Sequence, residues 1–228
     1  MATFVLIPGA GTDPRVFDPT IEELRALGHD ALAPPLPLGD PDARPSDHAA
    51  AVASATPERD DVVVVAQSLG AFAGPLVAER VGAARLVLLA PMVPLSGESA
   101  GDWWENTRHA EAIAGLTARH GPMSAWGEEA VREVFLHDVD PEVARATAHL
   151  SGQPGPGMFA EPWPHPGWPD VPTRVLVPRE DRLFPWEFQE RVVSERLGLE
   201  LDAMGGGHLP MLSRPAELAR RLAELYEA

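Results

Sequence analysis

The sequence predicts an α/β fold with a mostly parallel, doubly wound sheet and an inserted helical cap. Wholly apolar runs such as residues 62–65, four consecutive valines, alternate with segments whose apolar residues recur at helical spacing. A strand without polar alternation is buried on both faces, as in the middle of a parallel sheet. The alternation stops between about residues 97 and 165, where the sequence shows no convincing strand. Strands joined by helices favour a parallel sheet with right-handed crossovers, and the interruption predicts the cap.

Length and composition bound the class of protein. We expect one α/β domain over residues 1–228 with the cap at 97–165 inside it, because this length fills one sizeable core. The chain has no cysteine, which excludes disulfides, thiolate metal sites and cysteine nucleophiles. A net charge of −16 argues against nucleic acid or an anionic membrane as a partner, since both attract clustered positive charge. No basic residue precedes the first strand and no apolar run matches a membrane span, so we expect a cytoplasmic protein.

The elements before the cap follow the alternation. A strand at residues 3–7 ends in the loop Pro8-Gly9-Ala10-Gly11, and a helix capped by Thr12 or Asp13 follows. This glycine-rich turn could instead hold a dinucleotide, but the G-x-G-x-x-G/A pattern fails because its sixth position is Pro14. The further elements expected are a strand at 29–33, a helix at 46–55, a strand at 62–65, a helix at 71–81 and a strand at 85–90.

The cap and the end of the chain complete the prediction. Within the cap, helices are expected near residues 102–119, 125–136 and 141–150, the last capped by Asp140. His137, Asp138 and Asp140 could suggest a metal site, but a helix boundary explains them better. Residues 151–170 are too rich in proline and glycine for regular structure. The remaining elements are a strand at 173–177, a helix to about 197, a strand at 199–203, a loop at 204–210 and a helix at 214–226.

The junction at Ser68 is the first candidate for chemistry. A buried strand, one serine and a helix in succession are typical of a nucleophile elbow, which raises the serine hydroxyl above the carboxyl edge of the sheet. The elbow needs small residues two positions before and after the serine, and Ala66 and Gly70 stand there. Ser68 could otherwise simply cap the helix.

A serine nucleophile needs a base and an acid at the same edge of the sheet. Of the eight histidines, His208 lies in a loop directly after a late strand, behind three glycines. Asp181 follows the preceding strand, and its neighbour Glu180 is a rival acid. The tetrahedral oxyanion would be bound by the backbone N–H of Leu69 and by that of Ala10 in the first loop.

With these residues, the chain resembles the small α/β-hydrolases that include plant methylesterases, hydroxynitrile lyases and many bacterial esterase-like members. The resemblance covers nearly the whole length. Its motifs are Glu180-Asp181-Arg182 with Pro185-x-Glu187-Phe188-Gln189, then Gly206-Gly207-His208, then the start Phe4-Val5-Leu6-Ile7-Pro8-Gly9-Ala10. It implies the α/β-hydrolase fold, with Ser68 as nucleophile, His208 as base and Asp181 as acid.

The chain departs from the family pattern at several positions. Family members usually have His-Gly where this chain has Pro8-Gly9, and glycine where it has Ala66. Hydroxynitrile lyases carry threonine in place of Gly9 and lysine in place of Leu209, so the resemblance does not extend to cyanohydrin cleavage.

The function expected is a serine hydrolase that uses no cofactor and no metal and cleaves a small-molecule ester through an acyl-enzyme on Ser68. Aromatic residues in helices more often simply pack, but several residues are candidates to line an apolar substrate pocket. The candidate substrate-binding residues are Gly9, Met92, Trp103, Trp104, Trp126 and Phe159. Two alternatives stay open: a ligand-binding protein with a slow or vestigial triad, and a lyase or isomerase that uses His208 as general base.

Overall fold

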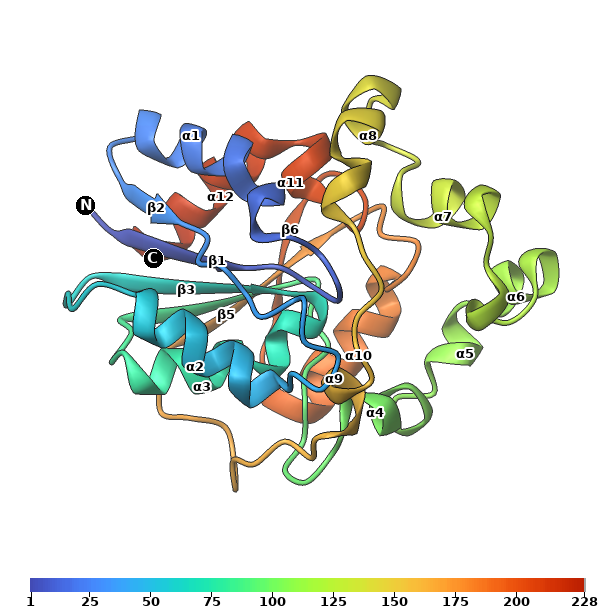
Figure 1. Cartoon of the computed structure of the whole chain (residues 1–228), viewed down its shortest axis with the longest axis horizontal. Coiled ribbons are helices and arrows are strands. Elements are labelled where there is room, and N and C mark those ends of the chain that lie inside the picture. Colours follow the sequence, from blue (N-terminus) through green and yellow to red (C-terminus); the bar gives the residue numbers. More distant parts are fainter. Residues whose placement is uncertain (228) are drawn as a thin grey trace.

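The computed structural model describes residues 1–227 and contains one parallel sheet. Its six strands run in the order β2-β1-β3-β4-β5-β6, which confirms the predicted α/β fold (Figure 1). The strands are β1 (Thr3–Ile7), β2 (Asp30–Leu32), β3 (Val62–Gln67), β4 (Arg85–Leu89), β5 (Thr173–Pro178) and β6 (Leu201–Met204). Every pair of neighbouring strands is parallel, so all carboxyl ends meet at one edge.

Helices cover both faces of the sheet (Figure 1). One face packs against α1 (Asp18–Ala26) and α12 (Pro215–Glu227), and the other against α2 (Pro45–Ala55), α3 (Gly74–Arg80) and α10 (Trp186–Leu197). The valines of β3 divide between the two layers, because successive side chains of a strand point to opposite faces. This double burial explains why the run of four valines has no polar alternation.

Several helix boundaries differ from the prediction because tight turns begin as 3₁₀ helix. The helix expected from residue 12 starts as η1 (Pro14–Phe17), where the Asp13 carboxylate accepts a hydrogen bond from the Arg15 N–H at 3.0 Å. The helix expected at 71–81 starts as η2 (Ser68–Phe72) and continues as α3. The loop expected at 204–210 ends in a further helical turn, α11 (Pro210–Ser213), which begins at a proline.

The inserted segment consists of short helices and not of the three longer helices expected. They are α4 (Ala100–Asn106), α5 (His109–Ala112), α6 (Ala114–His120), η3 (Met123–Ala125), α7 (Glu128–Phe135), α8 (Pro141–Thr147), η4 (Ala148–Leu150) and α9 (Gly157–Ala160). The helix predicted at 102–119 breaks because Arg108 has a left-handed φ of 53°. The Thr107 carbonyl also accepts a hydrogen bond from Arg191 of α10 at 2.6 Å and leaves the helical ladder. In Figure 1 the helices from α4 to α8 form an arc beyond the carboxyl edge of the sheet.

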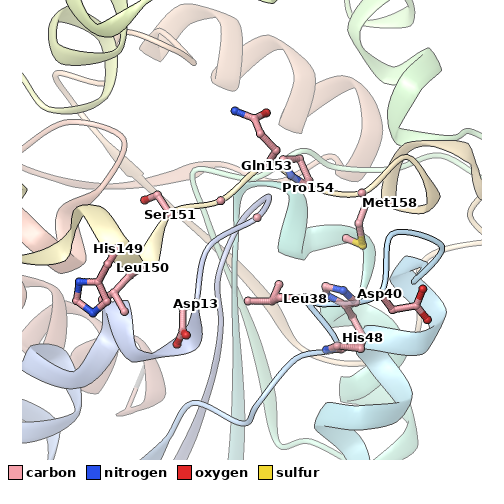
Figure 2. Close-up of a pocket in the computed structure, with 14 residues that line it drawn as sticks. Asp13, Leu38, Asp40, His48, His149, Leu150, Ser151, Gln153, Pro154 and Met158 are labelled. Atoms are coloured by element: carbon pink, nitrogen blue, oxygen red, sulfur yellow. The ribbon is translucent and has the colours of Figure 1, made fainter.

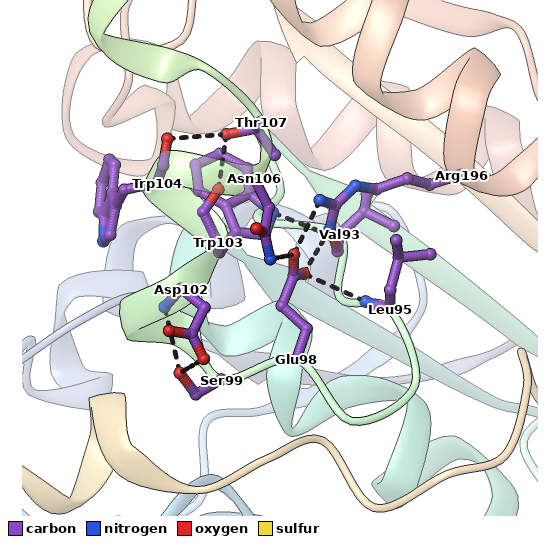
Figure 3. Close-up of polar contacts among 10 residues, drawn as sticks. All are labelled: Val93, Leu95, Glu98, Ser99, Asp102, Trp103, Trp104, Asn106, Thr107 and Arg196. Atoms are coloured by element: carbon purple, nitrogen blue, oxygen red, sulfur yellow. Dashed lines mark hydrogen bonds and ion pairs between the residues drawn. The ribbon is translucent and has the colours of Figure 1, made fainter.

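The two ends of the inserted segment lie side by side. Gly97 N–H donates to the Trp163 carbonyl at 3.0 Å, and Trp163 N–H donates to the Glu98 carbonyl at 2.9 Å. The Glu98 carboxylate is also paired with the guanidinium of Arg196 on α10 (Figure 3). The two ends of the inserted segment are therefore held together by backbone hydrogen bonds. Within the described chain, every helix is too short or too polar to span a bilayer.

Candidate active site

Ser68 lies at the turn where β3 passes into η2. Its φ is 53°, a left-handed value that is uncommon for any residue but glycine. The turn is closely packed: a Cβ on Gly70 would lie 2.7 Å from the Pro8 carbonyl oxygen, and one on Gly74 would lie 2.4 Å from the Ala66 Cβ. Gly74, which the sequence analysis did not single out, thus leaves the room that Ala66 occupies. The result is a serine held at the edge of the sheet by close backbone contacts.

His208 and Asp181 meet Ser68 at this edge. His208 Nε2 lies 3.1 Å from Ser68 Oγ, and His208 Nδ1 lies 2.8 Å from Asp181 Oδ2. All three residues are buried. The carboxylate can only accept, so Nδ1 carries the proton and Nε2 presents its lone pair to the serine hydroxyl. The arrangement can therefore remove the proton of Ser68.

The loop after β5 separates the two acidic candidates. Asp181 Oδ1 accepts hydrogen bonds from the N–H groups of Leu183 and Phe184, both at 2.9 Å. These bonds fix the carboxylate with its other oxygen on His208. Glu180 is exposed and accepts a hydrogen bond from the Gly206 N–H. The structure thus brings Asp181, and not Glu180, to the imidazole.

His109 supports the acid loop from the cap, a contact that the sequence analysis did not predict. Its Nε2 donates to the Leu183 carbonyl at 2.7 Å, and its ring packs edge-on against Phe184 and Phe188. Burial lowers the pKa of His109, against the opposing effects of the Leu183 carbonyl and of the Asp181 charge. The imidazole is accordingly neutral at pH 7. No sequence motif marks this histidine, because it meets the loop only through the folded cap.

The two expected oxyanion amides come from different elements. Leu69 is the second residue of η2, where a helix leaves N–H groups without an internal partner. Ala10 follows β1, and among the backbone hydrogen bonds of residues 1–227 none is donated by its N–H. The N–H of its neighbour Gly9 donates to Gln67 Oε1 at 2.8 Å. The first loop is thereby attached to β3.

The predicted substrate-binding residues occupy different places. Met92 is buried, and its N–H donates to the Ser68 carbonyl at 3.1 Å. Trp103 is fully buried with its Nε1 on the Val93 carbonyl (Figure 3), so it packs the core. The other four residues are half-buried. Gly9 borders Ser68, and Trp104 packs against Phe184. Trp126 Nε1 donates to the Gly121 carbonyl, and Phe159 lies beside Gly101.

Two rings that the sequence analysis did not name contact the imidazole of His208. Phe184 of the acid loop lies 5.1 Å away between ring centroids, and Phe135 of α7 lies 5.7 Å away, both edge-on. Phe135 ends a strongly amphipathic helix, and that pattern is the signal that could have found it. The inserted segment therefore reaches His208 through α7.

A cleft of about 180 Å³ lies behind the first loop (Figure 2). Gly11, Asp40, His48 and Met158 are among its lining residues. Burial lowers the pKa of His48, whose side chain points into this region. The returning chain closes tightly here: Gly152 N–H donates to the Gly11 carbonyl at 2.8 Å, and a Cβ on Gly11 would lie 2.3 Å from the Gly152 oxygen. The chain around Gly152 thus holds the loop that carries Ala10.

The acidic residues between α7 and α8 make structural contacts. Asp140 caps α8 by accepting from the Glu142 N–H at 2.7 Å, as expected of a helix boundary. Asp138 accepts from the Gly207 N–H at 2.8 Å and so contacts the loop before His208. In residues 1–227 no group of three or more histidine or acidic side chains is arranged to hold a metal ion.

Comparison with known proteins identifies relatives over the whole chain. A curated alpha/beta hydrolase, nvfD, of Aspergillus novofumigatus is 23% identical over 239 residues, covering 96% of this chain and 94% of its own. A probable hydrolase of a Phoma species is 28% identical over 240 residues, covering 97% of this chain and 96% of its own.

Solved structures match over a similar length. Polyneuridine aldehyde esterase superimposes with a TM-score of 0.80 at 20% identity, covering 99% of both chains. A pyrethroid hydrolase from Sphingobium faniae gives a TM-score of 0.73 at 21% identity, covering 100% of this chain and 98% of its own. At such identities these structures show the fold.

The family itself follows from a sequence model. The model of the alpha/beta hydrolase family matches residues 4–221. These residues run from β1 into α12 and include all of the strands from β2 to β6. The chain belongs to the alpha/beta hydrolase family.

Proposed function

We propose that the protein is a cofactor-free serine hydrolase that cleaves a small carboxylic ester. The observation that carries the proposal is the continuous hydrogen-bonded line from Ser68 Oγ through His208 to the Asp181 carboxylate. The names of solved neighbours, an esterase and a pyrethroid hydrolase, support hydrolysis of an ester.

The chemistry follows from the positions of these groups. His208 Nε2 takes the proton of Ser68 as Oγ attacks the ester carbonyl, and Asp181 stabilises the imidazolium that forms. The N–H groups of Leu69 and Ala10 bind the oxyanion. The imidazolium then protonates the leaving alcohol, and a water activated by His208 hydrolyses the acyl-enzyme.

The test is the Ser68→Ala variant against wild type, with a fluorophosphonate probe and p-nitrophenyl esters. The variant should lose covalent labelling and at least about 10⁴-fold in kcat, while its circular dichroism stays that of wild type. A variant that retains a tenth of wild-type activity would contradict the proposal, and would point to a lyase or isomerase in which His208 acts alone.

A further inference from the structure

Gln67 is a buried polar residue at the end of an otherwise apolar strand. It directly precedes Ser68 and is 2% exposed. A buried amide is unfavourable unless its donors and acceptor are hydrogen-bonded. Its contacts therefore show why the last position of β3 tolerates it.

One end of the amide holds the first loop. Pro8 has no N–H, so the first donor available after β1 is the N–H of Gly9. It donates to Gln67 Oε1 at 2.8 Å. A Cβ on Gly9 would lie 2.6 Å from this oxygen, so the loop approaches the amide as closely as only glycine allows.

The other end of the amide holds the base. Gln67 Nε2 donates to the His208 carbonyl at 3.2 Å and lies 3.3 Å from His208 Nε2. Rotating the amide by 180° would place its NH₂ against the Gly9 N–H and its oxygen against the His208 carbonyl. Both partners thus select the same orientation.

We propose that Gln67 is a positioning residue that joins the oxyanion loop to the catalytic base. The inference rests on the proposed function, because it assigns Gln67 the task of holding Ala10 and His208 at fixed places around Ser68. A displacement of about 1 Å in such groups lowers a rate by about 10²-fold. Pro8, which removes one possible loop donor, makes the bond from Gly9 to Gln67 the attachment of this loop to β3.

Two substitutions separate the two contacts. Gln67→Leu keeps the size of the side chain but removes both contacts, so phosphonylation by a fluorophosphonate and kcat for p-nitrophenyl acetate should fall by about 10²-fold. Gln67→Glu keeps the acceptor for Gly9 and places a carboxylate beside His208 Nε2. That charge favours the imidazolium, so the acid limb of kcat/KM against pH should move upward by about one unit or more.

The matched control is Gln189→Leu on α10. Gln189 is also fully buried, and its Nε2 donates to the Pro91 carbonyl at 3.1 Å. Loss of this bond should change the unfolding temperature and leave the labelling rate and the pH profile unchanged.

The outcomes distinguish this inference from the proposed function. If wild type is labelled at Ser68 but Gln67→Leu stays within threefold of it, or Gln67→Glu keeps the wild-type acid limb, the positioning role is wrong and the serine hydrolase stands. If wild type itself is not labelled and hydrolyses no ester, both fail. Should Gln67→Leu fold poorly by circular dichroism, the acid limb of Gln67→Glu decides.

Discussion

Two residues at the carboxyl edge of the sheet have left-handed backbone conformations that are uncommon for residues with a side chain. Ser68 and Ala90 follow the adjacent strands β3 and β4, and their φ values are 53° and 44°. Each costs roughly 1–3 kcal/mol in a residue with a side chain. The Met92 N–H, which donates to the Ser68 carbonyl, ties the two turns together. This strain places the serine hydroxyl where His208 can reach it.

The assignment of the acid is testable at this scale. Asp181→Asn should lower kcat by about 10³- to 10⁴-fold, because an amide neither selects the Nδ1-protonated tautomer nor stabilises the imidazolium. Glu180→Gln is the control, since Glu180 is exposed and holds a backbone amide of the next loop. Steady-state kinetics with p-nitrophenyl acetate measure both variants. A larger loss in Glu180→Gln than in Asp181→Asn would reverse the assignment.

The buried His109 predicts how stability depends on pH. Its pKa in the folded protein lies below the ordinary value of 6.5 because of burial, so below that pH the unfolded chain binds a proton that the folded chain does not. The contribution of His109 to the free energy of unfolding should therefore be largest above pH 6.5 and should decrease as the pH falls below that value.

Replacement of His109 tests that dependence. His109→Gln keeps a donor for the Leu183 carbonyl and removes the titration, so the loss of stability between about pH 7 and 5 should become shallower. Urea unfolding at several pH values measures the slope. His48, whose pKa burial also lowers, accounts for part of the remaining slope. An unchanged slope in the variant would show that His109 does not titrate as inferred.

Among the elements, strands were more predictable than helices. Both faces of β3 are buried, and a strand buried on both faces consists of consecutive apolar residues. The run of four valines therefore identifies this strand from the sequence alone. The prediction of one helix over residues 102–119 was wrong. Arg191, far along the chain, donates a hydrogen bond to the Thr107 carbonyl, where the helix is interrupted. Local propensity cannot report such a contact.

The base of the cap contains a buried ion pair between elements that the sequence does not link. The side chains of Arg196 and Glu98 are 7% and 4% exposed, and Arg196 Nη2 lies 2.9 Å from Glu98 Oε1. Glu98 also accepts from the Leu95 N–H at 3.2 Å and from Asn106 at 2.8 Å (Figure 3). The carboxylate therefore joins α10 to both the start and the first helix of the cap.

A double-mutant cycle tests this pair. Arg196→Met leaves a buried carboxylate without its cation and should lower the free energy of unfolding by about 3–5 kcal/mol. Adding Glu98→Gln should recover part of the loss, because the remaining group is neutral and still hydrogen-bonded. Arg132→Met, in an exposed pair on α7, should have little effect. Urea unfolding measures wild type, Arg196→Met, Glu98→Gln, the double variant and Arg132→Met, and strictly additive effects of the first two substitutions would show that the pair is not coupled.

At the scale of the whole molecule, the sequence predicted which residues come to one edge and that a helical segment is inserted between the strands, but not which side chains of that segment contact them. Ser68, Asp181 and His208 follow different strands of a parallel sheet, so topology alone places them at its carboxyl edge. Gln67, His109 and Phe135 reach the site through side-chain contacts across 58 or more residues or through the fold of the cap, and no local pattern records such contacts.

The inserted segment contacts His208, the loop that carries it and the first loop. Phe135 of α7 packs against the imidazole, and Asp138 just after α7 holds the Gly207 N–H of the loop that carries His208. Gly152, which follows η4, donates a hydrogen bond to Gly11 of the first loop. We therefore expect α7 to influence the size of the substrate accepted, because its Phe135 packs against His208.

Truncation of Phe135 tests whether the cap determines specificity. Phe135→Ala should raise kcat/KM for p-nitrophenyl octanoate relative to the acetate, because space opens beside His208 and each buried methylene of a longer chain contributes about 0.8 kcal/mol. Val131→Ala is the matched control, since Val131 lies one turn earlier on α7 and is 38% exposed. That variant should keep the wild-type ratio. If Phe135→Ala lowers the unfolding temperature but also keeps the ratio, α7 only packs against the base, and the size of the accepted ester must be set at Met92 and the first loop.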